Sequence, residues 1–259
     1  MRFRGLLSGL AVAVLLSGCA PLSEEVERNF LRGNRFLGEG LPQMAIQAYR
    51  RALSEDDARP EVWFNLGLAQ LRTGKPAEAA VSFRRSLRLK PSPEVWYNLG
   101  VAELRADNPA RAVTALNRSV ALEPRRPAAW NNLGVSYRRL GRYPLAEEAF
   151  RKAFSLDRND PKILNNFAWL YLVWRDAGAE RKKKALELAK KAEAKSRGKN
   201  ARILATLAEA YFANDDGGTA VRTMERALRL DPGNAYRKKR LSEYRGSPPA
   251  PGAGAPGAP

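Results

Sequence analysis

Apolar and small residues recur with a long period through the middle of the chain. Three segments read Trp-x-x-Leu-Gly and begin at Trp63, Trp96 and Trp130, so the tryptophans are 33 and 34 residues apart. Each is followed by an alanine and, four residues later, a larger apolar residue: Ala79 and Phe83, Ala112 and Leu116, Ala146 and Phe150. Spacings of three and four place such residues on one helical face. The pattern therefore predicts pairs of helices, in which the glycine lets the second helix approach the first closely.

This period and motif resemble the tetratricopeptide repeat, a helix–turn–helix unit of about 34 residues. One unit cannot bury its apolar face alone, so neighbouring units must stack. The resemblance implies an all-α fold, a right-handed solenoid of about six helix–turn–helix repeats. We expect the repeats to span residues 26–59, 60–92, 93–126, 127–160, 161–200 and 201–234.

Two parts of this array depart from the repeat pattern. In the fifth repeat we expect extra residues around Arg175 to Lys184 to separate the helices, with the second helix running from Ala185. Residues 235–245 are expected to form a charged helix that caps the last repeat. Residues 246–259 consist of proline, alanine and glycine with one serine, a composition typical of disorder.

The first eighteen residues have the features of a secretory signal peptide. Arg2 and Arg4 precede an apolar run from Leu6 to Leu16. This run is shorter than the about 18 residues that a membrane-spanning helix needs. We therefore assign residues 1–18 to a signal peptide; the alternative is a short membrane anchor followed by an incidental cysteine.

The signal ends in a motif that resembles the bacterial lipobox: Leu16, Ser17, Gly18 and Cys19. In lipoproteins the cysteine of this motif is acylated and becomes the first residue, so the resemblance implies a covalent lipid on Cys19. Residues 19–25 are then an acylated N-terminus and a short spacer. Ala20 is not the aspartate that commonly retains lipoproteins at the inner membrane. The resemblance therefore implies an outer-membrane protein, lipid-anchored and facing the periplasm.

Composition narrows the chemistry further. The 259 residues include no histidine and one cysteine, and the formal net charge is +18. Because it has no histidine, the chain has no Ser-His or Cys-His pair and no histidine metal site. We expect no enzymatic activity, no metal and no cofactor apart from the lipid on Cys19. Despite the charge, nucleic acid is an improbable partner for an exported lipoprotein.

Stacked repeats curve, and in tetratricopeptide proteins the first helices line the concave groove where partners usually bind. The apolar residues that this resemblance assigns to the groove are Phe64, Leu68, Leu71, Tyr97, Val101 and Leu104. One hypothesis is that they form an apolar trough, since an exposed apolar patch of this size usually marks a binding site. The alternative is that they are partly buried between neighbouring helices.

Two polar rows accompany the apolar one. Asparagines recur at Asn65, Asn98, Asn132 and Asn166, and arginines recur at Arg72, Arg105 and Arg139. Amides can pair with the backbone of an extended peptide, and arginines can bind acidic side chains. Family consensus accounts equally for the asparagines, and simple solvation for the arginines. If both rows bind, the partner is an amphipathic helix or a hydrophobic strand that is polar or acidic along one side.

A basic run follows from Arg181 to Lys184, with further lysines at Lys190, Lys191 and Lys195 and a second cluster from Arg237 to Arg240. A solvated helix face explains this charge without any partner. If the basic segment does bind, peptidoglycan carboxylates or anionic lipid headgroups are the better candidates.

A lipobox followed by about six tetratricopeptide repeats resembles the pilotin lipoproteins of type IV pilus systems, and among them the type that serves myxobacterial social motility. This resemblance implies a pilotin or assembly chaperone that binds the outer-membrane secretin subunit through its repeat groove and promotes membrane insertion and oligomerisation. The alternative is a periplasmic scaffold lipoprotein that recruits peptidoglycan hydrolases or proteases. An apolar groove favours the first function, and a charged groove with strong basic contacts to the cell wall favours the second.

Overall fold

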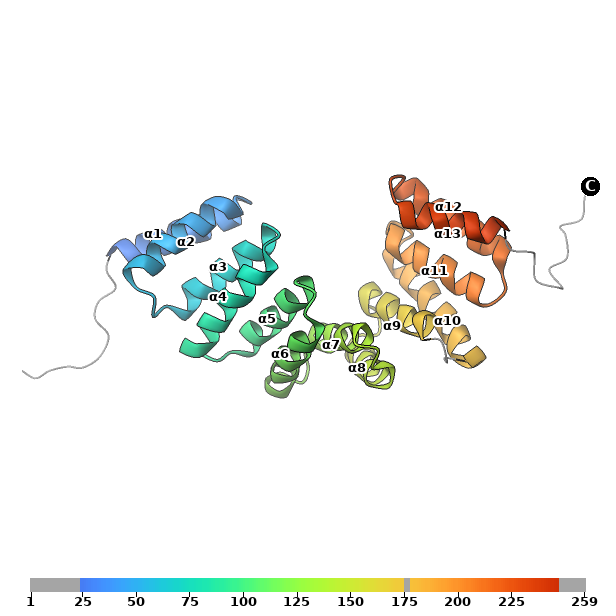
Figure 1. Ribbon diagram of the computed structural model, residues 1–259, viewed down its shortest axis with the longest axis horizontal. Helices are drawn as coiled ribbons and strands as arrows, with labels where there is room; N and C mark the ends of the chain where they lie inside the picture. Colours follow the sequence, from blue (N-terminus) through green and yellow to red (C-terminus); the bar gives the residue numbers. More distant parts are fainter. Residues whose placement is uncertain (1–23, 175–177, 247–259) are drawn as a thin grey trace, which may run out of the picture.

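The computed structural model describes residues 24–174 and 178–246, and these fold into thirteen α-helices that follow one another along a curved array (Figure 1). The signal peptide, Cys19 and the tail from residue 247 lie outside the described residues. The array rises at both ends and is lowest at α6 to α8, so that it forms an open V in this view. The helices are α1 Glu24–Gly38, α2 Pro42–Glu55, α3 Pro60–Arg72, α4 Pro76–Leu89, α5 Pro93–Arg105, α6 Pro109–Leu122, α7 Pro127–Arg139, α8 Tyr143–Leu156, α9 Pro161–Val173, α10 Gly178–Ser196, α11 Ala201–Ala213, α12 Gly217–Leu230 and α13 Ala235–Gly246.

Proline and left-handed residues set the helix boundaries. Seven helices begin with proline, which has no amide hydrogen to leave unpaired in the first turn and a fixed φ that suits a helix. The turn between the two helices of a repeat needs a residue with positive φ. Gly74 (φ 73°) and Gly141 (φ 70°) supply it in the second and fourth repeats, and Asp107 (φ 58°) in the third.

Within each repeat the two helices meet where the glycine of the motif faces the large apolar residue of the second helix. A Cβ atom on Gly67 would lie 2.6 Å from the ring of Phe83, and one on Gly100 would lie 2.5 Å from Cγ of Leu116. Carbon atoms pack at about 3.5–4.0 Å, so no side chain fits at these positions. The prediction that these glycines allow close helix contact is confirmed, and with it the all-α tetratricopeptide fold.

Consecutive repeats are joined mainly by packing of the second helix of one repeat on the first helix of the next, and the first helices also contact one another. Helices α1, α3, α5, α7, α9 and α11 each contact the next in this series. Consecutive second helices make no comparable contact within the described residues. The array therefore curves with the first helices on its inner side, and the second helices are splayed apart on the outer side.

The fifth repeat differs from its prediction. Helix α10 begins at Gly178, so Arg181 to Lys184 form its first turns rather than a separating loop. The guanidinium of Arg181 lies 4.4 Å from the ring centre of Trp174, and that ring stacks on Tyr143 at 5.6 Å. Arg181 also pairs with Glu147 at 3.4 Å. These contacts hold the start of α10 against α8 and stabilise the polar segment as a helix.

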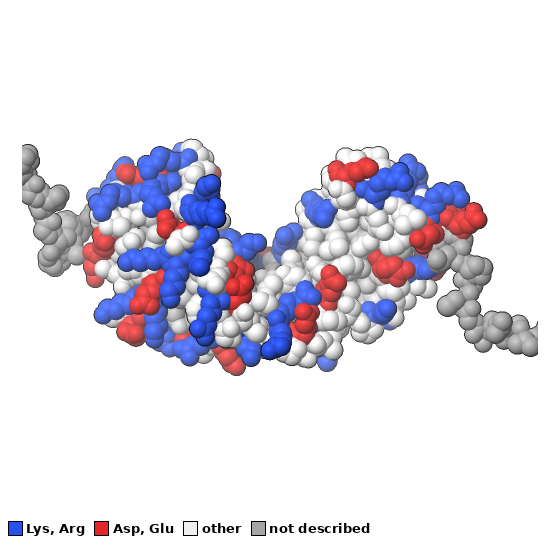
Figure 2. All heavy atoms as spheres, turned by 180° about the vertical axis from the view of Figure 1, so that it is seen from behind, with Lys and Arg blue, Asp and Glu red and all other residues white. Residues whose placement is uncertain are grey.

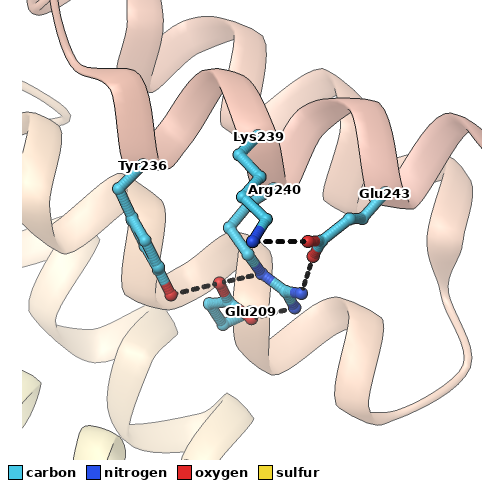
Figure 3. Close-up of polar contacts among 5 residues, drawn as sticks. All are labelled: Glu209, Tyr236, Lys239, Arg240 and Glu243. Atoms are coloured by element: carbon cyan, nitrogen blue, oxygen red, sulfur yellow. Dashed lines mark hydrogen bonds and ion pairs between the residues drawn. The ribbon is translucent and has the colours of Figure 1, made fainter.

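Helix α13 covers the exposed apolar end of the last repeat. Tyr244 and Leu241 are buried, and the Tyr244 ring stacks on Phe212 at 4.5 Å. Figure 3 shows the polar part of this contact, in which Arg240 donates to both oxygens of Glu209 at 2.7 and 2.6 Å. A bidentate ion pair of this kind fixes orientation as well as position. The helix ends at Gly246, one residue beyond its expected end.

Candidate protein-binding groove

The apolar residues proposed for the groove lie on α3 and α5 and are only partly exposed. Phe64, Leu68 and Leu71 are half-buried and pack against the core shared by repeats two and three. The Phe64 ring contacts that of Phe83 at 5.9 Å. Only part of each side chain is therefore accessible from the inner side of the array.

Leu104 does not belong to an exposed trough. Its side chain is 8% exposed and packs in the core between repeats three and four. The prediction that it faces the groove is wrong, because α7 of the following repeat covers this position. Val101, one turn earlier on α5, stays half-exposed.

Tyr97 is also half-buried, and residues of the next repeat surround its ring. The guanidinium of Arg126 lies 5.2 Å from the ring centre, and the amide of Asn132 lies 3.5 Å from the hydroxyl. The inner surface at Tyr97 is thus a mixed polar and aromatic one.

The arginine row joins successive repeats. Nη1 of Arg72 donates to the carbonyl of Leu37 at 2.7 Å, and Arg105 reaches the carbonyl of Leu71 at 3.4 Å. In the same way, Nη1 of Arg139 donates to the carbonyl of Leu104 at 2.9 Å. Each acceptor lies in the last turn of the preceding first helix, where carbonyls lack helical partners and a cation is favoured. The row is therefore a set of inter-repeat clamps, a role that sequence reasoning missed.

These clamps leave most of each guanidinium accessible. Arg72, Arg105 and Arg139 are exposed, and each uses only Nη1 in the contacts described. A guanidinium has five N–H donors, so further donors remain for a ligand at the rim of the groove. Arg139 also pairs with Asp107 at 3.3 Å, which partly offsets its charge.

The asparagine row is largely engaged within the array. Asn65 donates to Asn34 of the preceding repeat at 2.8 Å, and Asn166 donates to Asn131 at 3.1 Å. Asn98 instead donates to the carbonyl of Glu94 in its own helix. The amides that sequence analysis offered to a peptide backbone thus bind one another or the protein's own backbone in this structure.

A buried carboxylate, that of Glu147, lies at the junction of α8, α9 and α10. Glu147 accepts hydrogen bonds from Arg151 at 2.6 Å and from the hydroxyl of Tyr171 at 2.9 Å. Burial alone would raise the pKa of Glu147, but these bonds and the arginine charges outweigh it and hold the pKa below its usual value. Burial and the neighbouring carboxylate raise the pKa of Tyr171 to about 12. Glu147 of α8 thus binds Tyr171 of α9 and Arg181 of α10, and these contacts hold the three helices together.

Positive charge gathers on the C-terminal end of the array. Figure 2 shows Lys and Arg dominating the α9–α13 end, which lies on the left in that view. Lys182, Lys183 and Lys184 are exposed on α10. Among the described residues no helix is long and apolar enough to cross a membrane. Nor do the described residues contain a cluster of acidic, cysteine or histidine side chains suited to hold a metal.

The stacked helix pairs define this protein as a tetratricopeptide-repeat solenoid. The repeats of this class mediate protein–protein contacts. The chain belongs to the tetratricopeptide family described as the C-terminal domain of cilia and flagella-associated protein 70, whose model matches residues 12–243. No curated protein matches the sequence.

Solved structures of bacterial repeat proteins are similar over most of the chain. PilF of Pseudomonas aeruginosa is 23% identical with a TM-score of 0.67, and the match covers 85% of this chain and 98% of PilF. PilW, described as a widely conserved type IV pilus biogenesis factor, is 17% identical with a TM-score of 0.71 over 85% of this chain and 99% of its own. MamA is 27% identical with a TM-score of 0.59, over 68% of this chain and 94% of MamA.

Proposed function

We propose that this protein is a lipid-anchored pilotin of the outer membrane, which binds a type IV pilus secretin subunit and promotes its insertion and oligomerisation. The observation that carries the proposal is a length match: the chain aligns with nearly all of two repeat proteins, one of them described as a type IV pilus biogenesis factor. The lipobox ending at Cys19 supports the anchored location. Neither feature points to catalysis, and the repeat scaffold is a binding module.

The inner groove suits a partner segment with two different sides. Half-buried Phe64, Leu68 and Val101 offer apolar edges, and the exposed guanidinium of Arg105 stands at their border. An amphipathic helix or a β-forming segment would cover the apolar edges while its acidic side chains bind the arginines. Such a segment exposes apolar surface before membrane insertion, so covering it lowers the risk of aggregation.

The test changes two half-buried apolar side chains at the groove, so it includes a check that the variant folds. Leu68→Asp and Val101→Asp together place two carboxylates among the half-buried apolar edges. Leu122→Asp is the control, because Leu122 is 58% exposed at the end of α6, away from the groove. Circular dichroism first establishes that both proteins are folded. In cells, the groove variant should leave secretin multimers absent from outer-membrane fractions, whereas the control should assemble them normally.

Normal secretin assembly by the folded groove variant would refute this mechanism. A second candidate, the periplasmic scaffold that recruits peptidoglycan hydrolases or proteases, draws on the basic α9–α13 end (Figure 2). It predicts the opposite outcome: unchanged secretin assembly, and loss of cell-wall or hydrolase binding when Lys182, Lys183 and Lys184 are changed to glutamine. The pilotin proposal expects those three changes to alter secretin binding by only about 0–1 kcal/mol, as is typical of exposed charges.

A further inference from the structure

A groove opens on the outer side of the array, opposite the surface discussed so far. It lies between the second helices α4 and α6, with α5 as its floor, and has a volume of about 810 Å³. It exists because consecutive second helices splay apart and because α6 presents small residues here, Thr114 and Ala115, which do not fill the gap. We call this the α4–α6 groove; it is lined by Val81, Arg84, Leu87, Arg88, Trp96, Leu99, Glu103, Arg111, Thr114 and Ala115.

The preceding repeat has the equivalent feature, which we call the α2–α4 groove. Its volume is about 470 Å³, and its floor is formed by Trp63, Leu66 and Gln70 of α3. These residues stand one repeat before Trp96, Leu99 and Glu103. Val81 lines both grooves and is 54% exposed on the ridge of α4 between them. The two grooves share one architecture and can be compared position by position, with the residues Arg50, Leu53, Ser54, Trp63, Leu66, Gln70, Glu78, Val81 and Ser82 lining the α2–α4 groove.

The comparison isolates a difference in charge. Where the α2–α4 groove has Ser54 and Glu78, the α4–α6 groove has Arg88 and Arg111. Glu78 is neutralised by Arg50 at 3.4 Å and by a lysine at 3.7 Å. Arg88 and Arg111 are exposed, and neither makes an ion pair with any described residue. The α4–α6 groove therefore carries two uncompensated positive charges at its walls.

The one acid in this groove does not offset those charges. Glu103 is 2% exposed, and its carboxylate pairs with Arg84 at the base of the groove. This pair satisfies a buried charge, which would otherwise be costly to keep in the core. What remains open is an apolar floor of Trp96 and Leu99 below two unpaired guanidinium groups.

We propose that the α4–α6 groove is a second binding site, which takes an acidic peptide segment bearing a bulky apolar side chain. The apolar side chain lies on Trp96 and Leu99, and carboxylates on either side of it bind Arg88 and Arg111. Tryptophan and arginine together are the residues that most often dominate binding energy at protein interfaces. An apolar concavity with a few convergent charged groups is the usual form of a specific site. This inference goes beyond the proposed function and holds whichever partner occupies the inner groove.

A nucleic acid is a poorer fit to the same charges. Its affinity comes mainly from many phosphate contacts along a basic track, whereas only two free arginines line this groove. The apolar floor contributes nothing to phosphate binding. An oligonucleotide is therefore included in the test as a competitor.

The test uses a short fluorescein-labelled peptide that alternates glutamate with leucine and phenylalanine, and the full-length chain in detergent. One matched peptide carries lysine in place of each glutamate, and another carries serine in place of each apolar residue. By fluorescence anisotropy, we expect binding of the first peptide and at least about tenfold weaker binding of both matched peptides. Equal binding of the lysine peptide, or equal competition by a single-stranded oligonucleotide, would overturn the proposal.

The decisive variant gives the α4–α6 groove the residues of its neighbour, Arg88→Ser with Arg111→Glu. Both positions are exposed, so the fold should be unaffected. We expect Kd for the acidic peptide to rise about tenfold, which corresponds to about 1.4 kcal/mol. The control is Arg118→Glu, a charge reversal on the same helix α6 at an exposed residue outside the groove. An equal loss in the control would reduce the effect to general electrostatics and refute a site.

A third variant tests occupancy of the groove itself. Thr114→Trp adds a large side chain from an exposed wall position and should block peptide binding without changing charge. The indole N–H signal of Trp96, assigned through Trp96→Phe, should shift on peptide titration, and that of Trp130 should stay in place. Peptide binding that survives Thr114→Trp, or a titration that leaves the Trp96 signal unmoved, would place the peptide elsewhere and reject the proposal.

Discussion

Replacing Gly100 by alanine sets two effects of known size against each other at one contact between α5 and α6. Alanine is a better helix former than glycine by about 1 kcal/mol, so the change should stabilise α5 taken alone. In the folded array, however, the new Cβ atom would lie 2.5 Å from Cγ and 2.7 Å from Cδ2 of Leu116. Overpacking of this kind costs about 1–3 kcal/mol. We therefore expect Gly100→Ala to destabilise the protein by about 0–2 kcal/mol.

The sign of the effect should reverse when the obstacle is removed. Leu116→Ala alone leaves a cavity and should cost about 2–5 kcal/mol. In that background the clashing atoms are absent, so Gly100→Ala keeps only its helix-forming advantage and should stabilise by about 1 kcal/mol. The double-mutant cycle should thus give a coupling of about 1–3 kcal/mol between the two positions.

Urea unfolding followed by circular dichroism measures these differences, and hydrogen exchange in α5 and α6 locates them, because a repeat array can open locally. Gly218→Ala is the control: it lies in α12, and its new Cβ atom would meet nothing closer than 3.7 Å. That change should stabilise by up to about 1 kcal/mol. If Gly100→Ala is equally stabilising in both backgrounds, the close contact is not what requires glycine at this position.

Two further predictions concern contacts between repeats. Arg139→Gln removes the charged donor to the Leu104 carbonyl and should cost about 0.5–1.5 kcal/mol, measured by urea unfolding; exposed Arg125, changed in the same way, should cost nothing measurable. Folding lowers the pKa of Glu147, so its ion pairs should stabilise the protein above the unfolded-state pKa of 4.5 and lose this effect as pH falls through the lower folded value. The stability difference between the wild type and Glu147→Gln should therefore shrink below about pH 4.5, and a difference independent of pH would contradict this account.

The repeat period predicts contacts within a repeat better than contacts between repeats. Spacings of three and four residues define which side of each helix is apolar, and this is enough to predict that Gly100 lies where two helices touch; the structure shows that its neighbour there is Leu116. The rotation from one repeat to the next has no such signature in a single period. For that reason the pattern places Leu104 in the groove, whereas the structure buries it between repeats three and four.

The same limitation explains the arginine row and the start of α10. Arg72 reaches a carbonyl one repeat earlier, and backbone carbonyls leave no trace in the sequence pattern. The first turns of α10 are held by Arg181, which contacts Trp174, the residue that follows α9, and Glu147 of α8; these residues are far apart in the sequence. The donors, unlike the acceptors, are visible in the sequence. An arginine recurs near the end of three successive first helices, a position where a cation interacts favourably with terminal carbonyls.

Helix α5 contributes to both surfaces of the array, because it carries Arg105 on the inner side and forms the floor of the α4–α6 groove on the outer side. Arg105 holds the last turn of α3 to the last turn of α5, and therefore fixes the distance between repeats two and three on the inner side. The width of the α4–α6 groove is set mainly by the packing of α4 and α6 against α5, to which the contact of Arg105 on the inner side adds. A partner that draws Arg105 away from the Leu71 carbonyl would remove one of the contacts that hold α3 to α5.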